Sequence, residues 1–251
     1  MRKILKKIFE ILGYNISKIK KDKYPIDIPN ETIKIYEEVE PYTATSLERV
    51  NALLQSVVYI TENNIDGEIV ECGVWKGGSC MAVAIKLMEL EQKTREIWLY
   101  DTFEGMTEPT NHDIEIETGK KGKELLDGID KNTDKYNMWA YAPKEVVINN
   151  MKKTRYPTDN IKYITGNVEK TLKERKPKKI ALLRLDTDWY ESTKAELEEL
   201  YPHVVNGGII IIDDYGHFEG AKRAVDEYFE KEDNKPLLNR IDYTGRLIVK
   251  K

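Results

Sequence analysis

Four aspartates follow two strongly apolar segments of the sequence, at the points where buried strands would end. They are Asp186, Asp188, Asp213 and Asp214. If the segments 180–185 and 208–212 form neighbouring strands, the carboxylates of Asp186, Asp213 and Asp214 converge. Hard oxygen donors without cysteine favour Mg²⁺, or another oxygen-seeking divalent cation, over zinc. Three close carboxylates repel one another, which also argues for a cation between them.

Asp188 lies two residues after Asp186, so it need not bind the cation as Asp186 does. A carboxylate beside a metal-held hydroxyl group accepts its proton, which makes Asp188 a candidate general base. Helix capping is the alternative for these acids. Asp188 with Glu191 resembles a capping box, and Asp213 and Asp214 would cap a helix near His217. His217 itself is expected to be a local hydrogen-bond partner rather than a ligand.

A glycine-rich turn follows another apolar segment and leads into a helix-forming stretch. Its candidate ligand-binding residues are Glu71, Gly73, Val74, Trp75, Gly77, Gly78 and Ser79. Glycine lets the chain turn without a Cβ clash and lets a ligand approach the backbone. The spacing is neither GxGxxG nor a P-loop, and the nearby acid suits a cationic ligand better than a phosphate. The alternative is a tight strand–helix turn that binds nothing.

Asp101 follows the apolar segment 97–100. An acidic residue at the end of the second strand of a nucleotide-binding α/β fold accepts hydrogen bonds from ribose hydroxyl groups. The alternative is an aspartate that caps the next turn. Asn167 and Val168 follow the segment 161–165 and offer an amide and a backbone N–H to the edge of an adenine.

These residues belong to a pattern in which short apolar strands alternate with amphipathic helices. The strands are expected at 69–74, 97–100, 161–165, 180–185, 208–212 and 246–249, and the helices at 78–90, 191–201 and 221–229. Arg184 is the exception in an otherwise apolar strand. The pattern predicts a parallel sheet covered on both faces, with the last strand antiparallel at its edge. The ligand site is expected at the carboxyl ends of the strands.

The composition excludes several classes of protein. With 251 residues, 40% of them hydrophobic, the chain is long enough for a large core and is not disordered. The 40 basic side chains against 44 acidic ones give no global positive field for nucleic acid. No apolar run approaches the roughly 20 residues of a membrane span. Cys72 and Cys80 form no CxxC motif, which favours core packing in a protein of a reducing compartment, the cytoplasm.

The chain is expected to divide into residues 1–41 and one domain over 42–251. Residues 1–24 carry eight basic and two acidic side chains on a short amphipathic helix. This pattern predicts either peripheral contact with an anionic membrane surface or packing on the body or an oligomer interface. A proline-containing linker follows, and Thr45 with Glu48 resembles a capping box that opens a helix. The stretch 104–157 is polar and turn-rich.

Taken together, these residues resemble the macrocin O-methyltransferase (TylF-type) family, which includes the mycinamicin and novobiocin sugar O-methyltransferases. The resemblance rests on four segments in the family's order: GEIVECGVWKGGS (67–79), YDTFEGM (100–106), LDTDWYEST (185–193) and GGIIIIDDYG (207–216). The resemblance covers the chain from about residue 42 to residue 229. The basic N-terminal segment matches nothing in the family pattern, and residues 113–156 do not align with it.

The resemblance implies a Rossmann-like class I methyltransferase fold, with a mostly parallel seven-stranded sheet, an antiparallel edge strand and helices on both faces. It implies Mg²⁺-dependent transfer of a methyl group from S-adenosylmethionine to a sugar hydroxyl group, and a homo-oligomer. The sugar would belong to a natural product or a surface glycan. The stretch 104–157 would be an insertion or lid that contacts this acceptor.

The family's functional residues carry over by motif. Glu71 and the glycine-rich turn would hold the methionine end of S-adenosylmethionine, and Asp101 would bind its ribose. The turn at residues 166–168 would lie near the adenine. Asp186 would contact the cofactor and, together with residues 213 and 214, hold the metal, with Asp188 as general base.

Two other classes of function stay open. One is a different enzyme of this fold, either a methyltransferase that acts on a catechol or other diol or, with less support, a nicotinamide-dependent oxidoreductase. A catechol acceptor would need an aromatic-walled slot, for which the candidates are Trp139, Tyr141, Trp189 and Tyr190. The other class is a non-catalytic, membrane-associated binding module. The clustered aspartates argue against it, because a binding module has no need of them.

Overall fold

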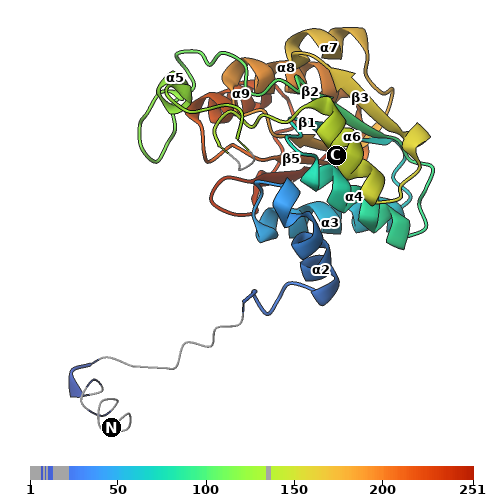
Figure 1. The fold of residues 1–251 in the computed structure, drawn as a ribbon, viewed down its shortest axis with the longest axis horizontal. Coiled ribbons are helices and arrows are strands. Elements are labelled where there is room, and N and C mark those ends of the chain that lie inside the picture. The colour runs from blue at the N-terminus through green and yellow to red at the C-terminus, as the bar shows by residue number, and fades with distance from the viewer. Residues whose placement is uncertain (1–6, 8, 10, 14–22, 134–136) are drawn as a thin grey trace.

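The computed structural model describes residues 7, 9, 11–13, 23–133 and 137–251 (Figure 1). In this part of the chain, one sheet has seven strands in the order β3-β2-β1-β4-β5-β7-β6. The strands are β1 (Glu68–Cys72), β2 (Ile97–Asp101), β3 (Ile161–Thr165), β4 (Ile180–Leu185), β5 (Val204–Ile212), β6 (Asn239–Arg240) and β7 (Arg246–Val249). Strands β1 to β5 are parallel, and β7 runs antiparallel to β5 and β6. The expected mostly parallel α/β sheet is confirmed.

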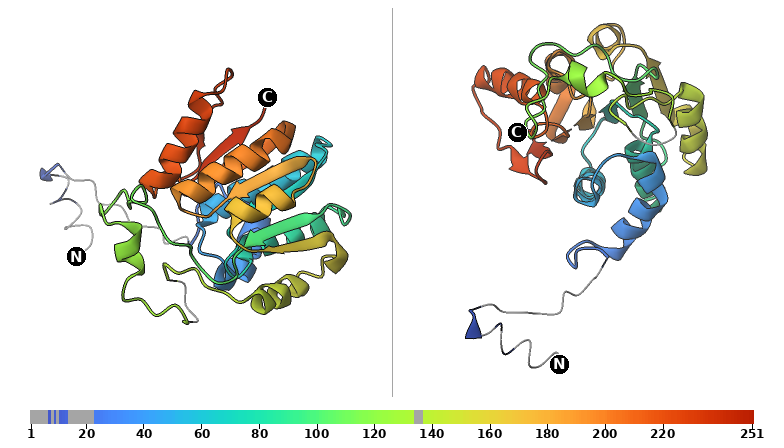
Figure 2. Two further views of the ribbon diagram at one scale, coloured as in Figure 1. Left: turned by 90° about the horizontal axis from the view of Figure 1, so that it is seen from above. Right: turned by 60° about the vertical axis from the view of Figure 1, so that its left-hand side comes forward.

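Helices cover both faces of the sheet (Figures 1 and 2). The helices are α2 (Asn30–Val39), α3 (Leu47–Glu62), α4 (Gly78–Glu89), α5 (Gly122–Leu126), α6 (Lys144–Lys153), α7 (Val168–Glu174), α8 (Tyr190–Leu200) and α9 (Glu219–Glu230). Short 3₁₀ turns are η1 (Glu40–Tyr42), η2 (Thr158–Asn160) and η3 (Tyr201–His203). Apolar side chains of α2, α3, α4 and α6 form one core with the sheet, and those of α7, α8 and α9 form a second core on its other face.

The strands form because each is an almost continuous apolar run, which suits a position buried on both faces. Every residue of β4 is buried, and so are the last five of β5. Because β4 and β5 pair in parallel, Leu185 lies beside Ile212, and both chains leave the sheet at the same edge. The sheet therefore brings the residues after these two strands together.

Several expectations about individual elements are wrong. The strand at 246–249 is not the edge of the sheet, because the two-residue strand β6 pairs with its outer side. Helix α3 is capped by Ser46, whose side chain accepts a hydrogen bond from the backbone of Arg49, and not by Thr45. The sequence reading also missed α2, α6 and α7. Helix α6 lies within the stretch 104–157, yet it packs into the core through Val147 and Met151.

Cys72 and Cys80 are buried and unpaired, as expected. No helix within the described ranges is both long and apolar enough to cross a membrane. The expected basic helix of residues 1–24 lies largely outside the described residues, so its contact with a membrane stays a prediction. The expected homo-oligomer is likewise a prediction.

Candidate active site

A cavity of about 400 Å³ opens at the carboxyl ends of the parallel strands. Its wall includes the turn after β1, the ends of β2 and β3, and the loops that follow β4 and β5. The predicted site residues that line the cavity are Glu71, Gly73, Val74, Trp75, Ser79, Asp101, Asn167, Val168, Asp186, Asp188, Asp213 and Asp214. Residues far apart in the sequence thus share one site at the edge expected for an open α/β sheet.

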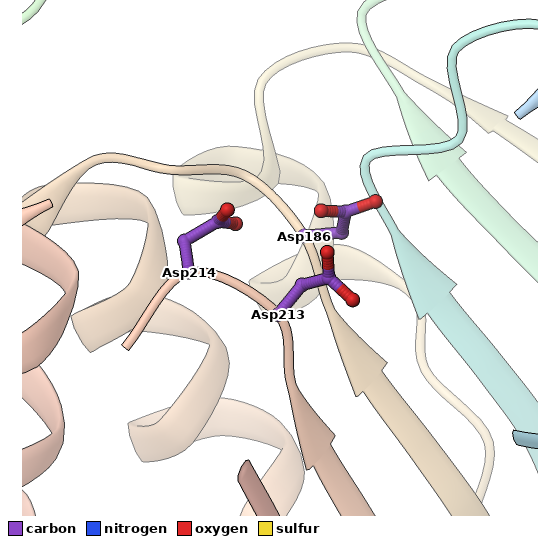
Figure 3. A group of neighbouring side chains, drawn as sticks. All are labelled: Asp186, Asp213 and Asp214. Atoms are coloured by element: carbon purple, nitrogen blue, oxygen red, sulfur yellow. The ribbon is translucent and has the colours of Figure 1, made fainter. Parts of the chain in front are cut away.

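Asp186, Asp213 and Asp214 converge, as Figure 3 shows for their carboxylates at the ends of β4 and β5. One carboxylate oxygen from each lies within 4.8 Å of the other two. Mg²⁺ binds oxygen at about 2.1 Å, so ligands on opposite sides of one ion stand about 4 Å apart. Carboxylates this close can approach one ion together when their side chains shift, and their all-oxygen donors suit Mg²⁺.

Arg184 is buried in the middle of this acidic group and binds three strand ends at once. Its Nη1 donates to Glu71 Oε1 and to Asp186 Oδ2, both at 2.6 Å. Its Nη2 donates to Asp213 Oδ1 at 2.6 Å and to Thr45 Oγ1 at 2.8 Å. Only 3% of the Arg184 side chain is exposed. A buried guanidinium is stable here because carboxylates surround it, and removing a partner would leave charge uncompensated.

A second arginine reaches Asp213 from helix α3. Arg49 Nη1 donates to Asp213 Oδ2, and Arg49 Nε lies 3.1 Å from Asp242 Oδ2. The sequence reading missed this residue because it stands far from the strand ends. It also treated Thr45 as a cap, whereas Thr45 is buried and accepts a hydrogen bond from Arg184.

Asp188 lies in the cavity wall beside the triad, in a backbone conformation that is rare for aspartate. Its φ is +65°, in the left-handed region. Burial, together with the nearby charge of Asp186, raises the pKa of Asp188 to about 7. Burial, together with the nearby charge of Asp188, also raises the pKa of Asp214. This environment suits a group that exchanges a proton near neutral pH.

The capping alternatives for these aspartates are wrong. Helix α8 begins at Tyr190, after Trp189, and the Tyr190 N–H is bound by Asp113 Oδ1 at 2.7 Å rather than by Asp188. Helix α9 begins at Glu219 without a side-chain cap. The carboxylates of Asp188, Asp213 and Asp214 therefore do not serve as helix caps.

The glycine-rich turn packs directly against the loop that carries Asp186. Gly73 has φ +79°, and a Cβ atom there would lie 1.9 Å from the backbone oxygen of Asp186. Gly77 and Gly78 do not line the cavity. A Cβ on Gly77 would lie 3.1 Å from Val147, and one on Gly78 would lie 2.5 Å from the backbone of Tyr42. These two glycines therefore permit close packing of the protein around the turn.

Asp101 organises the same turn. Its Oδ2 accepts hydrogen bonds from the backbone of Val74 at 2.8 Å and Trp75 at 3.3 Å, and its Oδ1 accepts one from Phe103 at 2.7 Å. Burial raises the pKa of Asp101, while these amide donors oppose that rise. Asp101 thus fixes the loop through backbone N–H groups, as in the turn-capping alternative, while it also lines the cavity.

Glu71 and Asn167 also bind within the protein. Glu71 is buried, and besides Arg184 it accepts a hydrogen bond from the Cys80 thiol at 3.0 Å. Asn167 caps helix α7 by accepting from the backbone of Glu169 at 2.8 Å. Both line the cavity, so their expected contacts with a ligand stay predictions.

Part of the expected lid closes one side of the cavity, where Met106, Glu115 and Met138 line it. Glu115 forms an antiparallel bridge with Phe218, and its Oε1 lies 3.5 Å from His217 Nε2. Burial lowers the pKa of His217, which favours its neutral form. The stretch 104–157 is therefore attached to the loop that follows Asp213 and Asp214. His217 lines the cavity, and its expected role as a local hydrogen-bond partner stays a prediction.

Asp113 ties the stretch 104–157 to helix α8, and the sequence reading gave it no role. Its side chain is fully buried. Its Oδ2 accepts from the backbone and the hydroxyl group of Thr110 at 2.6 and 2.8 Å, while its Oδ1 binds the first turn of α8. By contrast, the four aromatic residues named for a catechol slot do not line the cavity. They are Trp139, Tyr141, Trp189 and Tyr190.

Comparison with known proteins gives consistent matches. A family model described as macrocin O-methyltransferase (TylF) matches residues 37–250. The chain is 31% identical over 204 residues to demethyldecarbamoylnovobiocin O-methyltransferase of Streptomyces niveus, a match that covers 81% of this chain and 74% of that protein. It is 30% identical over 204 residues, with the same coverage, to 8-demethyl-8-(2,3-dimethoxy-alpha-L-rhamnosyl)-tetracenomycin-C 4′-O-methyltransferase of Streptomyces olivaceus. The structure of the O-methyltransferase NovP superposes with a TM-score of 0.71 at 31% identity, covering 83% of this chain and 82% of that one.

Proposed function

This chain belongs to the macrocin O-methyltransferase family and is an O-methyltransferase, and from this we propose that it methylates a hydroxyl group of a sugar, with S-adenosylmethionine as donor and Mg²⁺ as a required ion. A rhamnosyl group in the name of one relative supports the sugar acceptor. The observation that carries the proposal is the convergence of Asp186, Asp213 and Asp214 beside Asp188 in one cavity.

The proposed cofactor site is the part of the cavity formed by the turn after β1 and the ends of β2 and β3. The methionine end of S-adenosylmethionine would lie at the turn of residues 73–75, supported by Glu71 and Ser79. Asp101 would face the ribose, and Asn167 and Val168 the adenine. The absence of a P-loop or GxGxxG motif supports a donor without a pyrophosphate.

The proposed chemistry places the proton transfer on Asp188. A sugar hydroxyl group is a poor nucleophile because it keeps its proton at neutral pH. Mg²⁺ held by the triad would lower the pKa of a coordinated hydroxyl group, and S-adenosylmethionine would supply the methyl group. The Asp188 carboxylate would accept the hydroxyl proton while the oxygen is methylated. Arg184 would hold Asp186 and Asp213 at fixed positions for this reaction.

We also propose that the acceptor enters between the triad and the lid, where Met106, Glu115 and Met138 line the cavity. The sugar would belong to a natural product or a surface glycan. The catalytic unit would begin before the predicted boundary at residue 42, because α2 packs into the core of the domain, and it would be preceded by the basic segment 1–24, in a cytoplasmic protein.

A methyl-transfer assay tests the proposed function. Purified protein is incubated with S-adenosylmethionine labelled in its methyl group and with sugars that carry vicinal hydroxyl groups. Matched monodeoxy sugars and a catechol serve as comparison acceptors. We expect transfer to a sugar diol, its loss in EDTA and its recovery on addition of Mg²⁺. Transfer that is unchanged in EDTA would contradict the metal requirement, and transfer to the catechol alone would contradict the acceptor class.

A further inference from the structure

The two arginines that contact Asp213 bind different oxygens of its carboxylate. Arg184 occupies Oδ1, and Arg49 occupies Oδ2. Arg184 also occupies Oδ2 of Asp186. The oxygens of these two aspartates that Arg184 leaves for a cation are therefore Oδ1 of Asp186 and Oδ2 of Asp213.

The Arg184 side chain is buried and is held in one position by its contacts. It lies on β4, its side chain is 3% exposed, and its partners belong to β1, to the loops after β4 and β5, and to the residue Thr45 before α3. A guanidinium that leaves such a position loses its compensating charges in a buried environment, which is strongly unfavourable. Arg184 is therefore a permanent counter-ion of the acidic group.

Arg49 differs from Arg184 in its location, its exposure and its acidic partners. It lies on helix α3 and lines the cavity, and 11% of its side chain is exposed. Its Nε already contacts Asp242 Oδ2 at 3.1 Å and Ser46 Oγ at 3.3 Å. If Nη1 leaves Asp213, the guanidinium keeps an acidic partner in Asp242.

A divalent cation bound by the triad would meet Arg49 at Asp213 Oδ2. Two cations on one oxygen of the buried Asp213 carboxylate repel each other. We propose that Arg49 is an exchangeable counter-ion of the metal site, which neutralises Asp213 while the site holds no cation and moves onto Asp242 when Mg²⁺ binds. This inference rests on the proposed function, because it takes the triad to be a metal site.

The exchange explains how four aspartates stay close together in a metal-free protein. Arg49 reduces their mutual repulsion, so the site keeps its shape without the ion. The same contact lowers the affinity for the ion, because only molecules in which Arg49 has left Asp213 are competent to bind it.

Binding of Mn²⁺ alone, followed through the electron paramagnetic resonance signal of the free ion, tests the proposal without an activity assay. We expect R49M to bind Mn²⁺ roughly tenfold more tightly than the wild type, because the competing cation is gone. We expect D242N to bind it roughly threefold more weakly, because Arg49 loses its second partner. Asn keeps an acceptor oxygen for the backbone of Thr244 and Gly245, which Asp242 Oδ1 now binds.

The double variant R49M/D242N separates exchange from a general effect of charge. If Asp242 acts through Arg49, the double variant binds Mn²⁺ as R49M does. R223M is the matched control, because it removes the same charge from an exposed ion pair with Glu227 on α9, and it should leave the affinity unchanged. Thermal unfolding of each variant shows whether it is folded, and Mn²⁺ should raise the melting temperature of R49M more than that of the wild type.

The outcomes distinguish this inference from the proposed function. Unchanged or weaker Mn²⁺ binding in R49M overturns the exchange and shows that Arg49 only supports Asp213. A D242N effect that persists in the double variant overturns it as well. If R49M does not fold, the weaker binding expected of D242N, set against R223M, still decides the question. Absence of Mn²⁺ binding in every protein, the wild type included, overturns the metal site itself.

Discussion

Asp188 and Asp214 are neighbours in the cavity wall, where burial and the nearby charge of Asp188 raise the pKa of Asp214. Burial also raises the pKa of Asp188, to about 7, so these two neighbouring carboxyl groups favour retention of a proton near neutral pH. The pair lies beside Asp186 and Asp213, which Arg184 already holds. The site therefore contains one pair of acids that favours a proton near neutral pH and another pair that arginine compensates, and these two roles lead to different predictions.

Replacement of Asp188 tests its proposed role as the base. D188N should lower kcat by about 10²- to 10⁴-fold, because the amide cannot accept the hydroxyl proton. Binding of S-adenosylhomocysteine and of Mn²⁺ should stay close to that of the wild type, as measured by calorimetry. Asparagine has the same shape as aspartate, so the fold is expected to survive. A variant with full turnover would exclude Asp188 from the reaction.

Replacement of Asp101 tests the glycine-rich turn as part of the cofactor site. The side chain accepts three backbone N–H groups, and D101N replaces one of its oxygens by a donor that faces them. We expect the affinity for S-adenosylhomocysteine to fall by roughly 10- to 100-fold, which corresponds to about 1–3 kcal/mol for an unsatisfied buried group. Mn²⁺ affinity should not change. E104Q, an exposed acid in the same loop, is the control, and equal effects of the two variants would contradict the prediction.

Replacement of Asp113 tests the lid as an acceptor-binding element. Asp113 ties Thr110 to the start of α8, so D113A should loosen the lid without touching the cofactor turn. We expect KM for the acceptor to rise roughly tenfold, because positioning of the acceptor is lost, while the affinity for S-adenosylhomocysteine is kept. D113N should recover part of the effect, since it keeps one acceptor oxygen. A parallel loss of cofactor affinity would show that Asp113 serves the whole domain instead.

Replacement of Glu196 tests the pH dependence of stability. Glu196 is fully buried on α8, where its Oε1 accepts from the Thr187 hydroxyl group at 2.8 Å, and burial raises its pKa well above the usual range. The folded state therefore keeps a proton that the unfolded state releases near pH 4.3. The stability contributed by this group is complete below that pH and decreases as the pH rises towards the folded pKa.

E196Q removes this dependence because glutamine stays neutral. Relative to the wild type, the variant should gain about 1 kcal/mol or more in the free energy of unfolding between about pH 5 and about pH 8. Urea denaturation at the two pH values measures the difference. A difference between variant and wild type that does not change with pH would contradict the assignment of a raised pKa to Glu196.

The sequence predicted the structure correctly where a single apolar strand and the residues directly after it form the feature. Strands β3 and β4 have the predicted bounds because each is a short apolar run between polar segments. The convergence of the aspartates after β4 and β5 followed from parallel pairing of these two strands. A lone arginine in an apolar strand was a visible signal for Arg184, because a charge there is stable only among partners.

The features that the sequence did not predict depend on contacts between distant residues, which the local sequence pattern does not contain. Arg49 meets Asp213 across 164 residues of sequence, and its position on α3 gives no sign of that contact. In the sequence Asp113 resembles any acidic loop residue, because its contact with α8 forms only in the folded protein. Helix α6 was missed because its buried residues, Val147 and Met151, are sparse among polar neighbours, and Pro143 before it offers no side-chain cap.

The pairing of Arg184 with Glu71 also bears on how the sheet is assembled. The two residues are direct partners in the parallel ladder between β1 and β4. A slip of β4 by one residue would turn the guanidinium to the opposite face, into the apolar core under α7, α8 and α9, away from every carboxylate that neutralises it. Misaligned strands are thus penalised electrostatically during folding, so the acids and arginines of the proposed site also favour the correct alignment of β1 and β4.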